Sequence, residues 1–308
     1  MAMYHLRVKY LKRGEGRSAV AAAAYRSGTR LVDERGGAVH DYTRKQNVEH
    51  AEIMLPEGAP VALSDRGVLW NAIENGIKHP RAQPAMECEA ALPREMTKEQ
   101  CVALVRAFAR DMWVKRGVPV DIAIHRTVAA DGGEHPHVHF LIGTRRFEPD
   151  GSLGKAARDM QDSPMLVQKV YALEKEGKLD EALMLEKDLN LGAWRAGWAD
   201  YSNRFLADAG SGSRIDHRTL KAQAIAREPM PNLGLGYSRL RSLTGAMVER
   251  VKDFHARAFR NSLRTQMQAV EHKRPQLMAE FVALAREYGQ KLFPELGNTP
   301  EKGIAHDR

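Results

Sequence analysis

Short stretches in which apolar and polar side chains alternate predict the strands of this chain. In residues 4–10 every second side chain is apolar or aromatic, and residues 86–90 repeat this two-residue period. Successive side chains of a strand point to opposite faces, so the period indicates a strand with one face in a core. Residues 38–45 and 52–56 are predicted to contain two further short strands.

Two of the predicted strands are expected to form a hairpin that carries four histidines. Residues 118–125 alternate between valine or isoleucine and other side chains and end at His125, and residues 134–141 spell EHPHVHFL. The intervening residues 127–134 are rich in glycine and aspartate, which favour turns. The pattern therefore predicts two antiparallel neighbours in one sheet.

Helices are predicted where alanine is abundant or where apolar residues recur every three to four positions. The predicted ranges are 19–28, 65–77 and 98–116, and Gly28 and Gly117 stand where the first and third should end. The side chains expected to cap the first turns are Ser18, Ser64, and Thr97 together with Gln100.

From residue 154 onward the chain is predicted to be mainly helical. Residues 164–189 are charged and amphipathic, and Gly177 is expected to separate two helices there. Aromatic side chains follow at i, i+4, i+7 and i+11 from Trp194 to Phe205, a stripe that indicates packing rather than base stacking.

The C-terminal region and the fold class complete this picture. Two helices broken near Pro275 are predicted over residues 237–289, and residues 294–308 are expected to form a flexible polar tail. Upstream, strands and helices mix irregularly with several close antiparallel returns, which indicates an α+β fold. We therefore expect a central, largely antiparallel sheet with flanking helices, followed by a helical C-terminal region.

The composition says more about the binding partner of the chain than about its fold. The chain has 308 residues, 43% of them hydrophobic, and its net charge of +8 favours an anionic partner, either nucleic acid or a membrane surface. No apolar run approaches the ~18 residues of a membrane span, and the N-terminus lacks a signal-peptide pattern. A cytosolic protein without membrane insertion is expected. Cys88 and Cys101 lack a paired spacing and are predicted to be reduced packing residues.

The histidine spacing in the predicted hairpin points to a metal site. His135, His137 and His139 alternate and so share one face of their strand, and His125 lies on the neighbouring strand. A lone histidine on a strand is usually an ordinary surface or core residue, but two at alternate positions opposite a third form a recurrent three-ligand geometry. Neutral imidazoles suit zinc, manganese, nickel or cobalt, and a phosphate substrate would also recruit magnesium.

A tyrosine and two glutamates are further candidates, and each has a plainer interpretation. Tyr25 is the aromatic side chain of the alanine-rich helix, where a tyrosine most often fills a core with its hydroxyl in water. Glu87 and Glu89 share one strand face, either as solvent-exposed carboxylates or as a group that orients a metal-bound histidine. The residues alone leave both questions open.

Several separated motifs occur in an order that is typical of one known family. They are Tyr25, the runs HDYTRK, LWNAIE and ECEAALP, and IH followed by HPHVHFLIGTRRF, with WADYSNRFL and RIDHRT further on. Together they resemble the MobA/MobL family of plasmid relaxases, single-strand endonucleases whose metal site is a histidine–hydrophobe–histidine motif. The resemblance implies a nicking domain over residues 1–232 with a helical insertion near 164–189, then a helical region over 233–293.

Residue by residue, the resemblance makes Tyr25 the nucleophile and Glu87 a supporting carboxylate. The metal ligands that it implies are His125, His137 and His139. Magnesium or manganese is the favoured divalent ion, with zinc, nickel or cobalt as alternatives. This chain has His135 where the family often has asparagine, so His135 stays a competing ligand or a DNA contact. It has Met86 where the family usually has a basic residue, which leaves the choice between Glu87 and Glu89 open.

The implied reaction is site- and strand-specific nicking of plasmid DNA at a transfer origin, followed by rejoining, for conjugative mobilisation. A phenol with its ordinary pKa of about 10 is about a thousandth ionised at pH 7, which opposes attack by roughly 4 kcal/mol. A divalent cation on three histidines can offset this by polarising the scissile phosphate. Transfer to tyrosine gives a 5′-phosphotyrosine and conserves bond energy, so rejoining needs no ATP, and the sequence contains no phosphate-binding loop of the ATPase type.

The basic surplus suits single-stranded origin DNA as the substrate. Candidate contacts to its backbone, each of which could also belong to an ordinary solvated face, are Arg26, Arg30, Arg44, Lys45, Arg145 and Arg146. The resemblance further implies accessory relaxosome proteins, a separate helicase and a type IV coupling and secretion apparatus in a bacterial cytoplasm. The alternatives are a rolling-circle replication initiator, a metal-dependent phosphodiesterase that uses water and not Tyr25, and a DNA-binding accessory protein with a structural metal.

Overall fold

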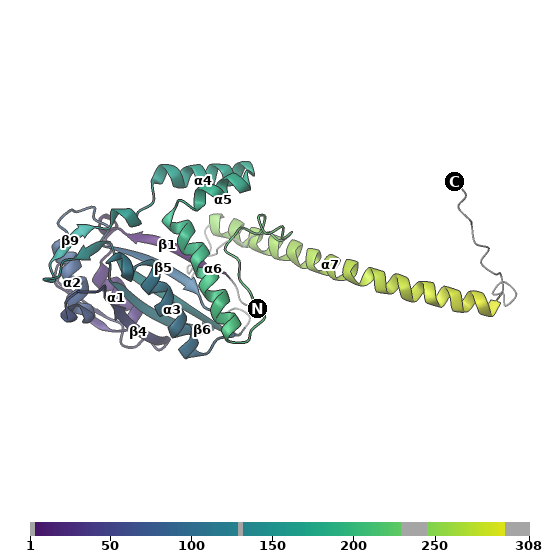
Figure 1. Ribbon diagram of the computed structural model, residues 1–308, viewed down its shortest axis with the longest axis horizontal. Helices are drawn as coiled ribbons and strands as arrows, with labels where there is room; N and C mark the ends of the chain where they lie inside the picture. Colours follow the sequence, from purple (N-terminus) through teal and green to yellow (C-terminus); the bar gives the residue numbers. More distant parts are fainter. Residues whose placement is uncertain (1–3, 129–131, 229–244, 293–308) are drawn as a thin grey trace, which may run out of the picture. The chain divides into compact units, whose positions relative to one another are not determined.

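A five-stranded antiparallel sheet organises the first of the two units into which the chain divides, residues 1–217 and 218–308 (Figure 1). The computed structural model describes residues 4–128, 132–228 and 245–292. The sheet has helices on both faces, so the predicted α+β class is confirmed. Its strands, in spatial order, are β1 (Leu6–Leu11), β5 (Ala85–Ala91), β7 (Glu134–Gly143), β6 (Val120–Val128) and β4 (Val48–Met54).

The predicted histidine hairpin is present as β6 and β7. The two strands pair antiparallel along their whole length, with His125 opposite His137 and Ala123 opposite His139. Strand β7 pairs on its other side with β5, where Glu89 lies opposite His139. The histidine strand is therefore the centre of the sheet, flanked by the strands that carry the other candidate residues.

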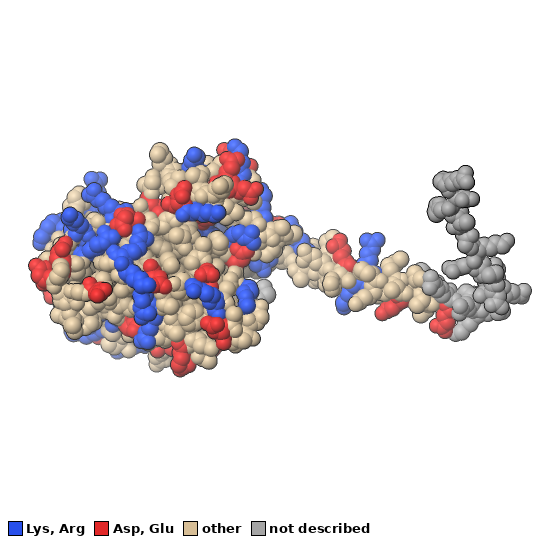
Figure 2. Space-filling view, viewed as in Figure 1, with Lys and Arg blue, Asp and Glu red and all other residues tan. Residues whose placement is uncertain are grey.

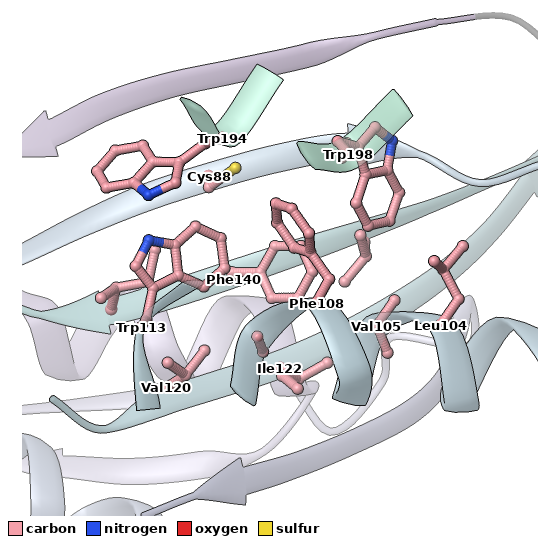
Figure 3. Close-up of a cluster of buried hydrophobic side chains, with 14 of the residues drawn as sticks. Cys88, Leu104, Val105, Phe108, Trp113, Val120, Ile122, Phe140, Trp194 and Trp198 are labelled. Atoms are coloured by element: carbon pink, nitrogen blue, oxygen red, sulfur yellow. The ribbon is translucent and has the colours of Figure 1, made fainter. Parts of the chain in front are cut away.

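The larger core lies between one face of the sheet and the helices α3 (Lys98–Met112) and α6 (Asn190–Asp208). Phe108 stands at its middle, with its ring edge-on to those of Trp113 and Trp198 and tilted against Phe140 (Figure 3). Trp194 and Trp198 are buried in this core, so the aromatic stripe packs as predicted.

The opposite face of the sheet packs against α1 (Ala19–Ser27) and α2 (Arg66–Gly76). Two small antiparallel sheets complete this layer, β2 (Arg30–Asp33) with β3 (Ala38–Asp41) and β8 (Arg145–Phe147) with β9 (Leu153–Ala156). The alanines of α1 bring its backbone close to the sheet. All the candidate site residues belong to this side or to its edge.

Helix α1 is fixed at both of its ends. Its N-cap Ser18 accepts a hydrogen bond from a first-turn amide, and the buried carboxylate of Glu74 accepts one from the amide of Ala19 at 2.8 Å. Glu74 is itself held by Arg13 at 2.5 Å. At the other end Gly28 has φ +67°, a left-handed conformation that glycine adopts without strain and that stops the helix as predicted.

Two predicted helix boundaries are wrong. Helix α2 is capped by Asp65, whose carboxylate accepts from the amide of Val68, because Ser64 already bonds back to Val61 within a preceding 3-10 turn. Helix α3 has its predicted capping box but ends at Met112. The 3-10 turns of the described chain are Arg13–Glu15, Val61–Ser64, Val114–Arg116 and Arg158–Met160.

The predicted break at Gly177 is confirmed, and the predicted break near Pro275 is wrong. Helices α4 (Pro164–Glu176) and α5 (Leu179–Glu186) meet at Gly177, which has φ +80°. In the second unit a single helix, α7 (Gly245–Leu292), runs through Pro275. Proline removes one backbone hydrogen bond, and helix-favouring segments on both sides carry the helix past it.

Some expectations fall outside what the structure describes. The predicted tail over 294–308 and the predicted domain boundary at residue 232 lie outside the described residues. Cys88 and Cys101 are both free and buried, as predicted. Within the described ranges, no helix combines the length and the apolar character that crossing a bilayer requires.

Candidate active site

Three histidines from the central hairpin come together on the α1 side of the sheet. One ring nitrogen from each of His125, His137 and His139 lies within 4.8 Å of the others. Their ring centroids are 4.7 to 5.3 Å apart. The register explains the cluster, because His125 and His137 are direct partners and His139 lies two residues further along the same face. The predicted trio can therefore reach a single ion.

Each ring of the trio has one nitrogen close to a polar atom of the protein. His125 donates from Nε2 to the backbone carbonyl of Arg26 at 2.6 Å, and His137 donates from Nδ1 to the carbonyl of His135 at 3.0 Å. The Nδ1 of His139 lies 3.3 Å from Oε1 of Glu87. Such partners set the tautomer and leave one lone pair on each ring. This donor set, one unprotonated nitrogen from each of three rings, fits a transition-metal or similar divalent ion.

Burial keeps His125 and His137 in the form that binds metal. Removal from water lowers the pKa of His125 to about 3 and also lowers the pKa of His137, and the neighbouring histidines add to both effects. Neutral imidazole is the ligand form, so these two rings need lose no proton at neutral pH.

Glu87 is the carboxylate that contacts the trio. Its side chain is 2% exposed, and besides His139 it binds Lys9 at 2.7 Å and the guanidinium of Arg26. Burial by itself would raise the pKa of Glu87, but the hydrogen bond with His139 and the charge of Arg26 outweigh it and hold that pKa well below its ordinary value. Glu87 is therefore a buried anion.

Glu89 shares the same strand face but has other neighbours. It lies opposite Arg7 in β1 and opposite His139 in β7, and it is partly exposed. No ion pair or hydrogen bond of Glu89 occurs among the described residues. Of the two glutamates that the sequence left open, Glu87 is thus the one in position to orient a histidine.

Arg26 connects the trio to the helix that carries the tyrosine. Its carbonyl accepts from His125, its guanidinium binds Glu87, and it directly follows Tyr25 in α1. The side chain is 12% exposed, which differs from the solvent-facing position that a contact to a DNA phosphate would need. Sequence reasoning missed this link and the Lys9 contact, because both depend on which elements lie beside β5.

Tyr25 lies at the surface and is not a core residue. It is 48% exposed, and its ring stands edge-on to that of Tyr42 with centroids 5.2 Å apart. Tyr25 and the segment 41–45 together line a hollow in the surface. The ammonium of Lys45 lies 4.0 Å from the centroid of the Tyr25 ring. Burial and the nearby charge of Arg26 lower the pKa of Lys45 to about 8.

The remaining predicted basic residues lie in different settings. Arg30, the first residue of β2, and Arg44, three residues after β3, are both exposed. Arg145 donates to the carbonyl of Gly154, and Arg146 binds Asp159 at 2.9 Å, so both also support the β8–β9 region. On the face of the first unit seen in Figure 2, lysine and arginine side chains are interspersed with acidic ones.

His135 lies beside the trio without joining it. Its ring centroid is 5.1 Å from that of His137, but its ring nitrogens fall outside the three-histidine cluster. Its backbone carbonyl accepts from Thr127 and from His137. The backbone carbonyl of His135 thus helps to orient the ring of His137.

Comparisons with known proteins agree on one family. The model of the MobA/MobL family matches residues 17–242. Mobilization protein MobL of Acidithiobacillus ferridurans is 35% identical over 291 residues, which cover 88% of this chain and 72% of that protein. Conjugal transfer protein TraA of Agrobacterium fabrum is 33% identical over 246 residues, which cover 77% of this chain but only 22% of that protein.

A solved structure has a similar fold over most of this chain. It is described as "Molecular Basis of Vancomycin Resistance Transfer in Staphylococcus aureus", with 26% sequence identity and a TM-score of 0.56. The match covers 71% of this chain and all of that chain.

Proposed function

The chain belongs to the MobA/MobL family, and from this premise we propose that it is a relaxase that nicks and rejoins one strand of plasmid DNA at a transfer origin. One observation carries the proposal. An exposed tyrosine, Tyr25, directly precedes the residue whose carbonyl and guanidinium contact both His125 and Glu87. A tyrosine one residue away from a side chain that contacts this histidine cluster suits phosphoryl transfer to a side chain.

The residues that would hold a divalent ion are His125 through Nδ1 and His137 and His139 through Nε2. When bound there, such an ion would polarise the scissile phosphate and stabilise the charge that develops on it. Glu87 keeps His139 in the required tautomer, and Arg26 compensates the charge of Glu87. Magnesium or manganese suits a phosphate substrate, and three imidazoles also accept zinc, nickel or cobalt.

Tyr25 performs the exchange of bonds. Its phenol oxygen attacks the scissile phosphorus, the phenol proton passes to solvent, and a bond forms between that oxygen and phosphorus. The bond from phosphorus to the 3′ oxygen breaks, and that oxygen takes up a proton to become a 3′-hydroxyl. One phosphodiester replaces another, so the reverse reaction reseals the strand without another energy source.

Single-stranded DNA is the substrate that the surface favours. The hollow beside Tyr25 is lined by residues 41–45, which include Tyr42 and Arg44. An exposed aromatic ring and an exposed cation, Tyr25 and Arg44, at one place suit an unpaired nucleotide and its phosphate. Accessory relaxosome proteins, a helicase and the coupling and secretion apparatus are the partners that the family leads us to expect.

A covalent-adduct assay tests the role of Tyr25. The protein, with magnesium or manganese, is incubated with single-stranded oligonucleotides that carry candidate origin sequences, and the products are separated on denaturing gels. We expect an adduct with wild type and none with Tyr25→Phe. Tyr171→Phe, which changes an exposed tyrosine on α4, is the matched control and should form the adduct normally. An adduct on Tyr25→Phe would refute this nucleophile, and nicking without an adduct would indicate a hydrolase that uses water.

A metal-binding assay tests the role of the trio. Isothermal titration should show one divalent ion per chain for wild type and none for the double variant His137→Ala with His139→Ala. The double variant should lose the ion because a site with one of its three ligands left rarely keeps it. Chelation of the metal from wild type should abolish the adduct. His135→Ala is the control and should retain one ion. Unchanged cleavage by the double variant would contradict the metal site.

A further inference from the structure

The side chain of Lys45 is turned toward Tyr25. Its Nζ donates to the backbone carbonyl of Tyr25 at 2.9 Å and lies 4.0 Å from the centroid of the Tyr25 ring. The side chain is only partly exposed, whereas that of the adjacent Arg44 is exposed. Its lowered pKa fits an ammonium group that is partly withdrawn from water. A contact to a DNA phosphate, which the sequence suggested, needs the opposite orientation.

The contact between Lys45 and the Tyr25 carbonyl also stabilises the C-terminal end of α1. The last four carbonyls of a helix have no partner within the helix, and that of Tyr25 is among them because α1 ends at Ser27. Lys45 satisfies this carbonyl and places a positive charge at the negative end of the helix. One side chain therefore holds both the backbone and the ring of the same residue.

The ring of Tyr25 is restrained from two sides. The ammonium of Lys45 is attracted to the electron-rich face of the ring, and the ring of Tyr42 stands at 86° to it. A tyrosine that is half exposed would otherwise change rotamer freely. Attack on phosphorus needs the oxygen close to the phosphate and in line with the leaving group, and a misplacement of about 1 Å can lower a rate about a hundredfold.

We propose that Lys45 is a positioning residue that fixes the ring of Tyr25 and the last turn of α1, so that the phenol faces the scissile phosphate. Lys45 does not bind the DNA backbone. The inference rests on the proposed function, since it assigns Lys45 to the nucleophile of that reaction. The restraint on the Tyr25 ring is present in the free protein, so it can be tested without DNA.

The first test separates the rate of the chemical step from the affinity for DNA. In Lys45→Met the single-turnover rate at saturating oligonucleotide should fall about ten- to a hundredfold. The Kd, measured in a Tyr25→Phe background, and its dependence on salt should not change. Lys45→Arg, which restores a cation, should recover most of the rate. Lys115→Met, in the 3-10 turn after α3, is the matched control and should change neither quantity.

A phosphate contact would give the opposite result. Loss of one contact to single-stranded DNA weakens binding and lowers the slope of log Kd against log salt by about 0.7. If Lys45→Met showed that change with an unaltered rate at saturation, the inference would be overturned. If Lys45→Met does not fold, Lys45→Gln carries the same test, because it keeps a donor for the Tyr25 carbonyl.

The second test does not depend on cleavage. In protein with labelled tyrosine, the ring resonances of Tyr25 are assigned with Tyr25→Phe, and magnetisation transfer between the rings of Tyr25 and Tyr42 is measured. We expect this transfer in wild type and Lys45→Arg and its loss in Lys45→Met. Unchanged transfer in Lys45→Met would refute the inference even if wild type formed the adduct. A wild type with restrained rings but no adduct would refute the proposed function alone.

Discussion

At the scale of single residues, the candidate centre depends on what surrounds each histidine. A backbone carbonyl holds His125 and another holds His137, and a carboxylate holds His139. The first two partners belong to the main chain and cannot be removed by substitution. Glu87 is the partner that a substitution can change, and it links the trio to Lys9 and Arg26.

The Glu87 contact leads to a prediction about metal affinity. Glu87→Gln should weaken binding of the divalent ion about ten- to a hundredfold, because an amide orients and polarises the ring of His139 less well than a carboxylate does. Isothermal titration on folded protein checks this. Glu89→Gln, on the same strand face, is the control and should change the affinity little. Equal losses in the two variants would show that Glu87 has no special position.

At the scale of elements, α1 is the part that brings the tyrosine to the histidines. Its start is held by Ser18 and Glu74, and its end by Gly28, Lys45 and the Arg26 carbonyl. Its residues contribute little bulk of their own to a core. The helix therefore depends on its polar attachments, and these should be sensitive points.

The attachment through Asp33 leads to a prediction about pH. Asp33 is buried and accepts hydrogen bonds from the Ser18 hydroxyl at 2.5 Å and from the Gly36 amide. Burial opposes its ionisation, but these hydrogen bonds outweigh burial and lower the pKa of Asp33. A lowered carboxyl pKa stabilises the fold above the ordinary value of about 3.9, and this contribution is lost as pH falls below it.

Asp33→Asn should therefore lower the free energy of unfolding by about 1–3 kcal/mol at neutral pH. The difference from wild type should stay constant down to about pH 5 and shrink in more acidic solution. Guanidinium unfolding at a series of pH values measures it. Glu57→Gln, at an exposed loop position, should change stability by less than about 0.5 kcal/mol. A difference that persisted into strong acid would contradict the role given to Asp33.

At the scale of the whole molecule, the candidate residues occupy only the first unit. Every one of them, from Tyr25 to Arg146, lies within residues 1–217, which contain the complete five-stranded sheet and both of its helical layers. The second unit consists, in its described part, of residues 218–228 and the helix α7. The chemistry should therefore be separable from α7.

A fragment of residues 1–217 should fold cooperatively and form the same covalent adduct as the full chain. The two core clusters that enclose its sheet consist of residues of the first unit. Circular dichroism melting and the yield of adduct at saturating oligonucleotide measure the two properties. A fragment that melts like the full chain but forms no adduct would place part of the active site in residues 218–308.

Much of the fold could be predicted because its signals are local. The two-residue period of β6 and β7 places the histidines on one face wherever the hairpin lies, and the caps at Ser18 and Thr97 depend only on backbone within one turn. The wrong helix cap and the wrong helix break were also decided by nearby residues. Asp65 outcompeted Ser64 as a cap because Ser64 was already bonded, and Pro275 was too weak a signal to end a long helix.

Side-chain period and residue type predicted most of the elements and the shared face of the histidines, and the family resemblance added the candidate nucleophile. Only the tertiary structure decided the neighbours. Placing β5 between β1 and β7 brings Glu87 against Lys9, Arg26 and His139, and folding residues 41–45 back onto α1 turns Lys45 toward Tyr25. Strand order and loop path join residues far apart in the chain, and no local pattern records which of them will meet.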